Sequence, residues 1–194
     1  MKLYMIRHGE SCANRDDLFS LPTVPLTENG IRDAEGAGRM LSRIPFDRVL
    51  VSPYYRAQQT LHHALPGVEA EVVEALHECD CGSLEGNPMS EMRARYPDLA
   101  QHIAEDDYTA YGGENYAHIR ERVRSLMDYV LTLNAERVVA FTHAGVILTF
   151  FDEVTGRGEK IGRHVECKNG GINVFEYKNG TWRVSALNLT EEYY

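Results

Sequence analysis

Short apolar runs alternate with longer stretches of helical periodicity along most of the chain. The runs have the length and composition of buried strands, and the stretches between them repeat apolar residues at helical spacing. The predicted strands are residues 3–6, 48–52, 71–74 and 137–142. The predicted helices are residues 27–42, a segment from Ser52-Pro53 to before Pro66, residues 115–133 and residues 146–154. Strands that alternate with helices predict an α/β fold with a mostly parallel sheet.

The C-terminal part follows a different pattern. Residues 172–189 alternate with period two on both sides of Asn179-Gly180, a dipeptide typical of tight hairpin turns. The sequence therefore predicts a three-layer α/β/α sandwich whose mostly parallel central sheet is extended by a C-terminal hairpin.

Two helix starts carry capping signals. Thr27 is expected to be the N-cap of the predicted helix at residues 27–42, with Glu28 in its first turn. Ser52 is expected to cap the next helix, with Pro53 at its first position, where a missing N–H costs nothing.

The region from Leu76 to about Glu114 is less regular. It contains a polar helix at residues 90–96 and an acidic, tyrosine-bearing loop at residues 105–111. Long irregular segments inside a compact domain are commonly functional lids. We therefore expect one domain over residues 1–194, with an inserted cap at about residues 79–113.

Composition and charge narrow the function classes. The chain has 194 residues, 43% of them hydrophobic, and a formal net charge of −9. The negative charge argues against nucleic acid and acidic membrane surfaces as partners, and no apolar run has the length of a membrane span. An anionic substrate would have to be met by a local positive pocket.

The cysteines give no metal or disulfide pattern. Cys12, Cys79, Cys81 and Cys167 show no C-x-x-C spacing, and reduced thiols of a cytoplasmic protein are the simplest interpretation. Cys12 lies near His8 in sequence, so its oxidation would affect activity, but an inert thiol is favoured.

Polar residues follow three of the predicted strands. Arg7 and His8 come directly after the first, Arg56 follows the second, and His143 follows the fourth. Ligands of open α/β sheets lie outside the carboxyl ends of the strands, so these side chains are expected to converge. Two arginines and two histidines suit phosphoryl transfer, which depends on positioning and charge stabilisation. With no acid-rich metal cluster or Walker loop, a metal-free covalent reaction without a cofactor is predicted.

Five segments in order resemble the histidine phosphatase superfamily, in its phosphoglycerate mutase-like branch. They are MIRHGES at 5–11, VSPYYRAQQT at 51–60, LHECDCGSLEG at 76–86, GGE at 112–114 and FTHAGVI at 141–147. The resemblance implies a phosphoglycerate mutase-like fold, with His8 as the nucleophile that forms a phosphohistidine. It further implies the following roles: Arg7, Arg56 and His143 bind the phosphoryl group in the ground and transition states, Glu78 is the general acid and base, and Asn14 and Ala144 line the phosphate pocket.

Some assignments stay open at this point. Asp80 or Glu85 is an alternative general acid to Glu78. Glu114 is either a partner that orients an arginine or simply a first-turn acid favoured by the helix dipole. The chain also departs from the family pattern at residues 19–22, where many relatives carry a Thr/Ser-Gly pair, and at Ala144, where glycine is common.

The predicted reaction is hydrolysis of a small phosphomonoester. The segment from residue 87 to residue 111 carries only the cations Arg93 and Arg95 among a larger number of acids, a poor clamp for a bisphosphorylated substrate such as fructose 2,6-bisphosphate. Tyr108 and Tyr111 would either stack on a substrate ring or pack within the cap. A phosphoglycerate mutase and a catalytically weak phospholigand-binding module are the alternatives, and a homodimer is left open.

Overall fold

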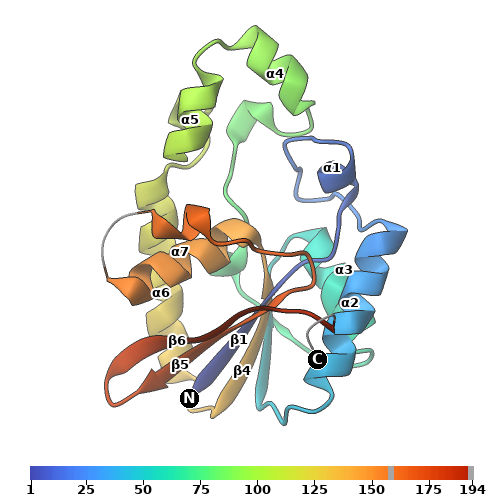
Figure 1. Ribbon diagram of the computed structural model, residues 1–194, viewed down its shortest axis with the longest axis vertical. Helices are drawn as coiled ribbons and strands as arrows, with labels where there is room; N and C mark the ends of the chain where they lie inside the picture. The colour runs from blue at the N-terminus through green and yellow to red at the C-terminus, as the bar shows by residue number, and fades with distance from the viewer. Residues whose placement is uncertain (157–159, 192–194) are drawn as a thin grey trace.

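A six-stranded sheet forms the centre of the molecule in the computed structural model, which describes residues 1–156 and 160–191 (Figure 1). The strand order is β3-β2-β4-β1-β5-β6, and β1 to β4 are parallel while β5 and β6 are antiparallel to their neighbours. The strands are β1 (Lys2–Arg7), β2 (Arg48–Val51), β3 (Glu71–Val72), β4 (Arg137–Thr142), β5 (Ile172–Lys178) and β6 (Thr181–Leu189). The predicted mostly parallel sheet with a C-terminal hairpin is confirmed.

Helices cover both faces of this sheet. The α-helices are α1 (Cys12–Arg15), α2 (Glu28–Leu41), α3 (Tyr55–Ala64), α4 (Met89–Arg95), α5 (Leu99–Glu105), α6 (Tyr116–Thr132) and α7 (Ala144–Thr155). The 3₁₀ helices are η1 (Glu74–Leu76), η2 (Gly82–Leu84), η3 (Thr109–Tyr111) and η4 (Ile161–His164). The three-layer α/β/α prediction is therefore confirmed.

Alternation along β1 explains the two layers. Leu3 and Met5 pack with α6 and α7, whereas Tyr4 and Ile6 pack with α2 and α3. Successive side chains of a strand point to opposite faces, so a continuous apolar run can feed two separate cores. Both faces of the central strands are consequently closed to water, and the carboxyl edge of the sheet remains as the place for polar chemistry.

Register brings the ends of the central strands to one level. Arg7 of β1 pairs with Thr142 of β4, and Val51 of β2 pairs with Phe141 of β4. The next residues are held in step, because His8 N donates to Thr142 O at 2.9 Å and Ser52 N donates to Phe141 O at 2.9 Å. His8, Ser52 and His143 therefore leave the sheet side by side.

The predicted start of the second large helix is wrong. Ser52 does not cap it: α3 begins at Tyr55 with Tyr54 as its N-cap, and no side chain caps the helix. The Ser52 hydroxyl is instead engaged with His143 and with the Tyr54 N–H. The Thr27 cap, in contrast, is confirmed, since its side chain accepts a hydrogen bond from Gly30 N.

The segment from residue 79 to residue 113 lies beyond the carboxyl ends of the strands, at the top of Figure 1. It contains more helix than predicted: α5 occupies Leu99–Glu105, and η3 lies in the part expected to be a loop. Leu84, Met92, Leu99 and Tyr108 of this segment form a small core together with Phe19, from the loop after α1. Within the described residues, no helix is long and apolar enough to cross a membrane.

Candidate active site

His8 is held in one orientation at the carboxyl end of β1. Its side chain is 3% exposed, and its Nδ1 lies 2.7 Å from Gly9 O. A carbonyl oxygen can only accept, so Nδ1 carries the proton and Nε2 carries the lone pair. Burial, Arg56 and Arg7 all hold the His8 pKa well below its usual value. A neutral imidazole with an unprotonated Nε2 is a nucleophile.

The loop after His8 is fixed by close backbone packing. A Cβ on Gly9 would lie 2.1 Å from Gly30 O, and a Cβ on Gly30 would lie 2.0 Å from Glu10 O. The loop therefore rests directly on the start of α2, and Gly9 is required by this packing. Gly9 N also donates to Thr60 Oγ1 at 3.0 Å, which ties the loop to α3. Thr60 was not predicted, although it ends the 51–60 segment.

His143 lies beside His8 as the last residue before α7. The two ring centroids are 5.2 Å apart, and the His143 side chain is fully buried. Its Nε2 lies 2.8 Å from Ser52 Oγ, and its buried Nδ1 has no partner in the described part of the chain. Burial and the charge of Arg56 lower the His143 pKa well below its usual value. An unpartnered buried nitrogen is costly without a ligand, so this atom is suited to contact one.

Two guanidinium groups complete the positive cluster. Arg56 is 1% exposed, and its Nε donates to His8 Nε2 at 3.2 Å. Its Nη1 donates to Leu21 O at 3.1 Å, so the segment that departs from the family pattern orients Arg56 through its backbone. Arg7 donates through Nη1 to Cys167 O, while its buried Nε has no partner among the described residues.

The aromatic ring of Tyr54 packs next to these groups. Its ring lies 5.1 Å from Arg56 Cζ, 5.3 Å from the His143 ring and 5.9 Å from the His77 ring. The face of a tyrosine attracts a cation, so Tyr54 helps to hold the Arg56 guanidinium in place. Burial raises the Tyr54 pKa, with the nearby Glu85 and Asp80 acting in the same direction.

The Glu78 carboxylate lies against the start of α7. Its Oε1 accepts from Cys79 N at 3.0 Å, and its Oε2 faces Gly145 N at 3.4 Å. The Glu78 carboxyl group is thus held at the N-terminus of α7, two residues after His143. All three candidate acids accept a local backbone hydrogen bond, Asp80 Oδ1 from Gly82 N and Glu85 Oε1 from Cys81 N. Glu78 is favoured because it is the one among them that also contacts α7, next to His143.

Gly145→Ala is expected to displace the Glu78 carboxylate without unfolding the protein. The new Cβ would lie 2.4 Å from Glu78 Oε1, and the end of a flexible side chain can move away. Stability should change by no more than about 1 kcal/mol, because alanine is the better helix former. Phosphate release from an alkyl phosphate should fall about 10- to 100-fold, as expected for a misplaced general acid.

Thermal unfolding and steady-state rates would measure both effects. Gly36→Ala on α2 is a matched control, since its Cβ would meet only the flexible ends of Glu191 and Arg39. In a Glu78→Gln background, Gly145→Ala should cost little more. A full loss in that background would mean that Gly145 acts independently of Glu78.

The remaining predicted residues lie around this cluster. Asn14 is exposed, and its Oδ1 accepts from Ser11 N at 3.1 Å and faces Asn169 Nδ2 at 3.4 Å. Asn169, which was not predicted, also donates to His8 O at 2.9 Å. Ala144 is the first residue of α7, next to His143. Glu114 forms an ion pair with Arg122, not with an arginine of the pocket.

Tyr108 and Tyr111, expected either to stack on a substrate ring or to pack within the cap, both pack against aromatic rings of the protein itself. Tyr108 is 8% exposed and meets Phe19 edge to face, with ring centroids 6.4 Å apart. Tyr111 contacts the rings of Tyr96 and His102. Of the two interpretations, packing is the one that these contacts favour.

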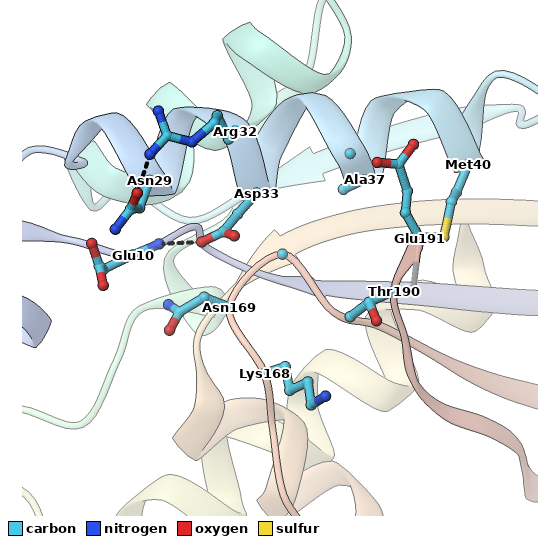
Figure 2. Close-up of a pocket in the computed structure, with 12 residues that line it drawn as sticks. Glu10, Asn29, Arg32, Asp33, Ala37, Met40, Lys168, Asn169, Thr190 and Glu191 are labelled. Carbon is cyan, nitrogen blue, oxygen red and sulfur yellow. Dashed lines mark hydrogen bonds between the residues drawn. The ribbon is translucent and has the colours of Figure 1, made fainter. Parts of the chain in front are cut away.

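A separate cavity of about 520 Å³ lies against α2 (Figure 2). Glu10, Asp33 and Asn169 are among its lining residues, and Glu10 N donates to Asp33 Oδ2 at 2.9 Å. Burial raises the Asp33 pKa. None of the side chains predicted to be catalytic lines this cavity, although Asn169, which donates to His8 O, does.

Taken as chemistry, the cluster offers a nucleophilic imidazole, two guanidinium groups, a second imidazole and a carboxylate. Guanidinium forks match the peripheral oxygens of a phosphoryl group. In the part of the chain that is described, no group of three or more His, Cys, Asp or Glu side chains is arranged to hold a metal ion.

Comparison with known proteins agrees with this chemistry. Residues 3–190 match the family model of the histidine phosphatase superfamily (branch 1). The adenosylcobalamin/alpha-ribazole phosphatase of Salmonella typhimurium is 32% identical over an alignment of 206 positions. The alignment covers 98% of this chain and 92% of that protein.

Two further likenesses differ in extent. The mouse fructose-2,6-bisphosphatase TIGAR is 31% identical over 141 residues, and the match covers 68% of this chain. The chain spans only 51% of the length of that relative. The crystal structure of the alpha-ribazole phosphatase from Shigella flexneri superposes with a TM-score of 0.87 at 24% identity, covering 97% of this chain and 96% of that chain. At that identity the superposition shows the shared fold.

Proposed function

Because the chain belongs to the histidine phosphatase superfamily (branch 1), we propose that it is a metal-independent phosphomonoesterase for a small phosphorylated metabolite. The observation that carries the proposal is the orientation of His8. Its Nδ1 proton is held by Gly9 O, and its Nε2 lone pair faces the Arg56 guanidinium beside His143.

The reaction proceeds in two displacements. His8 Nε2 attacks phosphorus, the P–O bond to the leaving alcohol breaks, and Glu78 gives its proton to the departing oxygen. Arg7, Arg56 and His143 stabilise the charge on the three peripheral oxygens. A water molecule then attacks the phosphohistidine, Glu78 takes its proton, and inorganic phosphate leaves with His8 restored.

The cap supports hydrolysis over mutase chemistry. Arg93 and Arg95 are both exposed on α4, where Arg93 reaches Met89 and Arg95 lies over the Tyr96 ring. Neither offers a second anion site next to His8, which a bisphosphorylated primer or a sugar bisphosphate would need.

The four free cysteines support a reducing compartment such as the cytoplasm.

Phosphate release from a panel of phosphomonoesters in the presence of EDTA tests this function. The panel contains 4-nitrophenyl phosphate, sugar phosphates, a sugar bisphosphate, nucleotides, phosphoserine, ribazole phosphate and 3-phosphoglycerate. We expect release from monophosphates at a rate that EDTA does not reduce, and slower release from the bisphosphate.

Two outcomes would contradict the proposal. Conversion of 3-phosphoglycerate that depends on a bisphosphoglycerate primer, without phosphate release from any other compound, would identify a mutase. Release that EDTA abolishes and added divalent metal restores would show that a metal ion is required.

A further inference from the structure

Arg122 of α6 connects the helix to the segment that carries Glu78. Its Nη1 donates to two backbone carbonyls, Ala75 O at 3.0 Å and His77 O at 2.8 Å. Its Nε and Nη2 donate to Glu114, at 3.2 Å to Oε1 and 2.9 Å to Oε2. One guanidinium thus binds a carboxylate with two parallel bonds and holds the chain just before Glu78.

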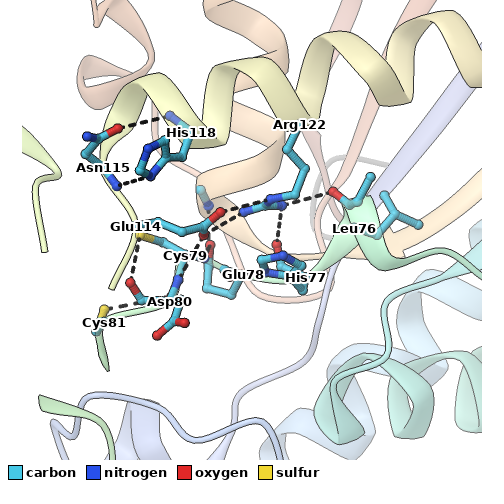
Figure 3. Close-up of polar contacts among 12 residues, drawn as sticks. Leu76, His77, Glu78, Cys79, Asp80, Cys81, Glu114, Asn115, His118 and Arg122 are labelled. Carbon is cyan, nitrogen blue, oxygen red and sulfur yellow. Dashed lines mark hydrogen bonds and ion pairs between the residues drawn. The ribbon is translucent and has the colours of Figure 1, made fainter. Parts of the chain in front are cut away.

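Glu114 holds the same segment on the other side of Glu78. Its Oε2 accepts from Asp80 N at 3.0 Å, and its own N–H donates to Asp80 O at 2.8 Å. Figure 3 shows the two side chains meeting above residues 76–81. The backbone is therefore fixed at His77 and at Asp80, the positions on either side of Glu78 and Cys79.

The pair is mostly shielded from solvent. The Arg122 side chain is 13% exposed and the Glu114 side chain 18% exposed. Hydrogen bonds to charged groups are stronger than neutral ones, and a buried fork fixes orientation as well as distance. A lysine at position 122 could not reproduce these contacts, because its single ammonium group has no planar fork.

We propose that the Arg122–Glu114 clamp, defined by these two side chains and their bonds to residues 75–80, positions Glu78 for proton transfer. This inference rests on the proposed phosphatase function. The Glu78 side chain is held by the N–H groups of Cys79 and Gly145, so its place relative to His143 depends on where the backbone of residues 77–80 stands. Arg122 and Glu114 act through Glu78 and are positioning residues.

Dependence on the leaving group separates this role from general loss of structure. An alkoxide needs a proton to leave, whereas 4-nitrophenolate is a weak base that leaves without one. Glu78 acts on the leaving group in the first displacement and on water in the second, and the second step is common to both substrates. Arg122→Gln is therefore expected to lower kcat/KM for the best alkyl phosphate, which reports the first displacement, about 30-fold, since small misplacements of a catalytic acid are costly. For 4-nitrophenyl phosphate the loss of kcat/KM should stay below about threefold.

The experiment compares wild type, Arg122→Gln, Glu114→Gln, the double variant and Glu78→Gln on both substrates. The double variant should lose no more activity than the more impaired of the two single variants, because the two residues form one unit. Glu78→Gln should show the same selective loss, larger in size. Thermal unfolding verifies that each variant is folded, and Glu114→Gln provides the test if Arg122→Gln does not fold.

Arg120→Gln is the matched control. Arg120 lies on the same helix and forms a comparable ion pair, with Glu153, and none of its contacts reaches residues 75–80. Its activity on both substrates should equal that of wild type.

If folded Arg122→Gln and Glu114→Gln lose kcat/KM equally on both substrates, the proposed positioning role of the clamp is wrong, while the phosphatase proposal stays intact. Equal losses of kcat/KM on both substrates in Glu78→Gln would also contradict the positioning role, because Glu78 would then not be the acid that protonates the leaving group. A wild-type protein that hydrolyses no alkyl phosphate would overturn the proposed function and the clamp together.

Discussion

Replacing His8 with alanine is expected to lower phosphate release by a factor of about 10⁴ or more, the scale seen when a covalent nucleophile is removed. No neighbouring group can substitute for it. His143 Nε2 is bonded to Ser52, and the orientation that exposes a lone pair to the Arg56 guanidinium belongs to His8 alone among the described histidines. The variant should remain folded, because the loop backbone is fixed by Gly30 and Thr60.

Trapping the intermediate gives the sharper measurement. Wild type mixed with a ³²P-labelled substrate and stopped rapidly in base should retain protein-bound label that acid releases, as a phosphoramidate does. His8→Ala should retain none, and His62→Ala, at an exposed position on α3, should retain as much as wild type. Label on the His8→Ala protein would place the nucleophile elsewhere.

The sequence predicted the layers of the fold because the buried strands have simple patterns. The run at 137–142 and the alternation around Asn179-Gly180 both correspond to observed elements, β4 and the β5–β6 hairpin. Where tertiary contacts compete with local preference, the prediction was wrong. Ser52 has the ideal chemistry of a helix cap, yet its hydroxyl is used by His143, which is distant in sequence.

The residues around the site were predictable only in part. His8 and His143 follow strands directly, and Arg56 lies in the first turn of the helix after β2, so the topology of an α/β sheet is enough to bring them together. Thr60, Asn169 and Arg122 lie within a helix or a loop, and their partners are backbone atoms of remote segments. Sequence periodicity contains no signal for such bonds. The short helix α5 was missed because it has only seven residues, so the one pair of large apolar residues at helical spacing, Leu99 and Ile103, is too weak a signal.

Arg56→Met is expected to lower kcat/KM about 100- to 1,000-fold or more, the cost of losing one preorganised donor to the transition state, while leaving the protein as stable as wild type or more stable. Within the described residues Arg56 forms no ion pair with a carboxylate, although it is 1% exposed. Burial lowers its pKa, which shows that the folded state disfavours this charge. Methionine fills a similar space without the desolvation cost, and we expect this gain to offset the lost hydrogen bonds to Leu21 O and His8 Nε2.

The contrast between activity and stability is what identifies Arg56 as a binding group. A phosphoryl group would supply the missing negative charge, so inorganic phosphate should raise the Tm of wild type, by the equivalent of about 2.7 kcal/mol at one hundred times its Kd. Arg56→Met should lose this response together with its activity. Arg39→Met, which removes an exposed arginine paired with Glu191, should keep both. A destabilised Arg56→Met variant that still responds to phosphate would mean that Arg56 is a structural cation, because a charge retained for substrate must cost stability in its absence.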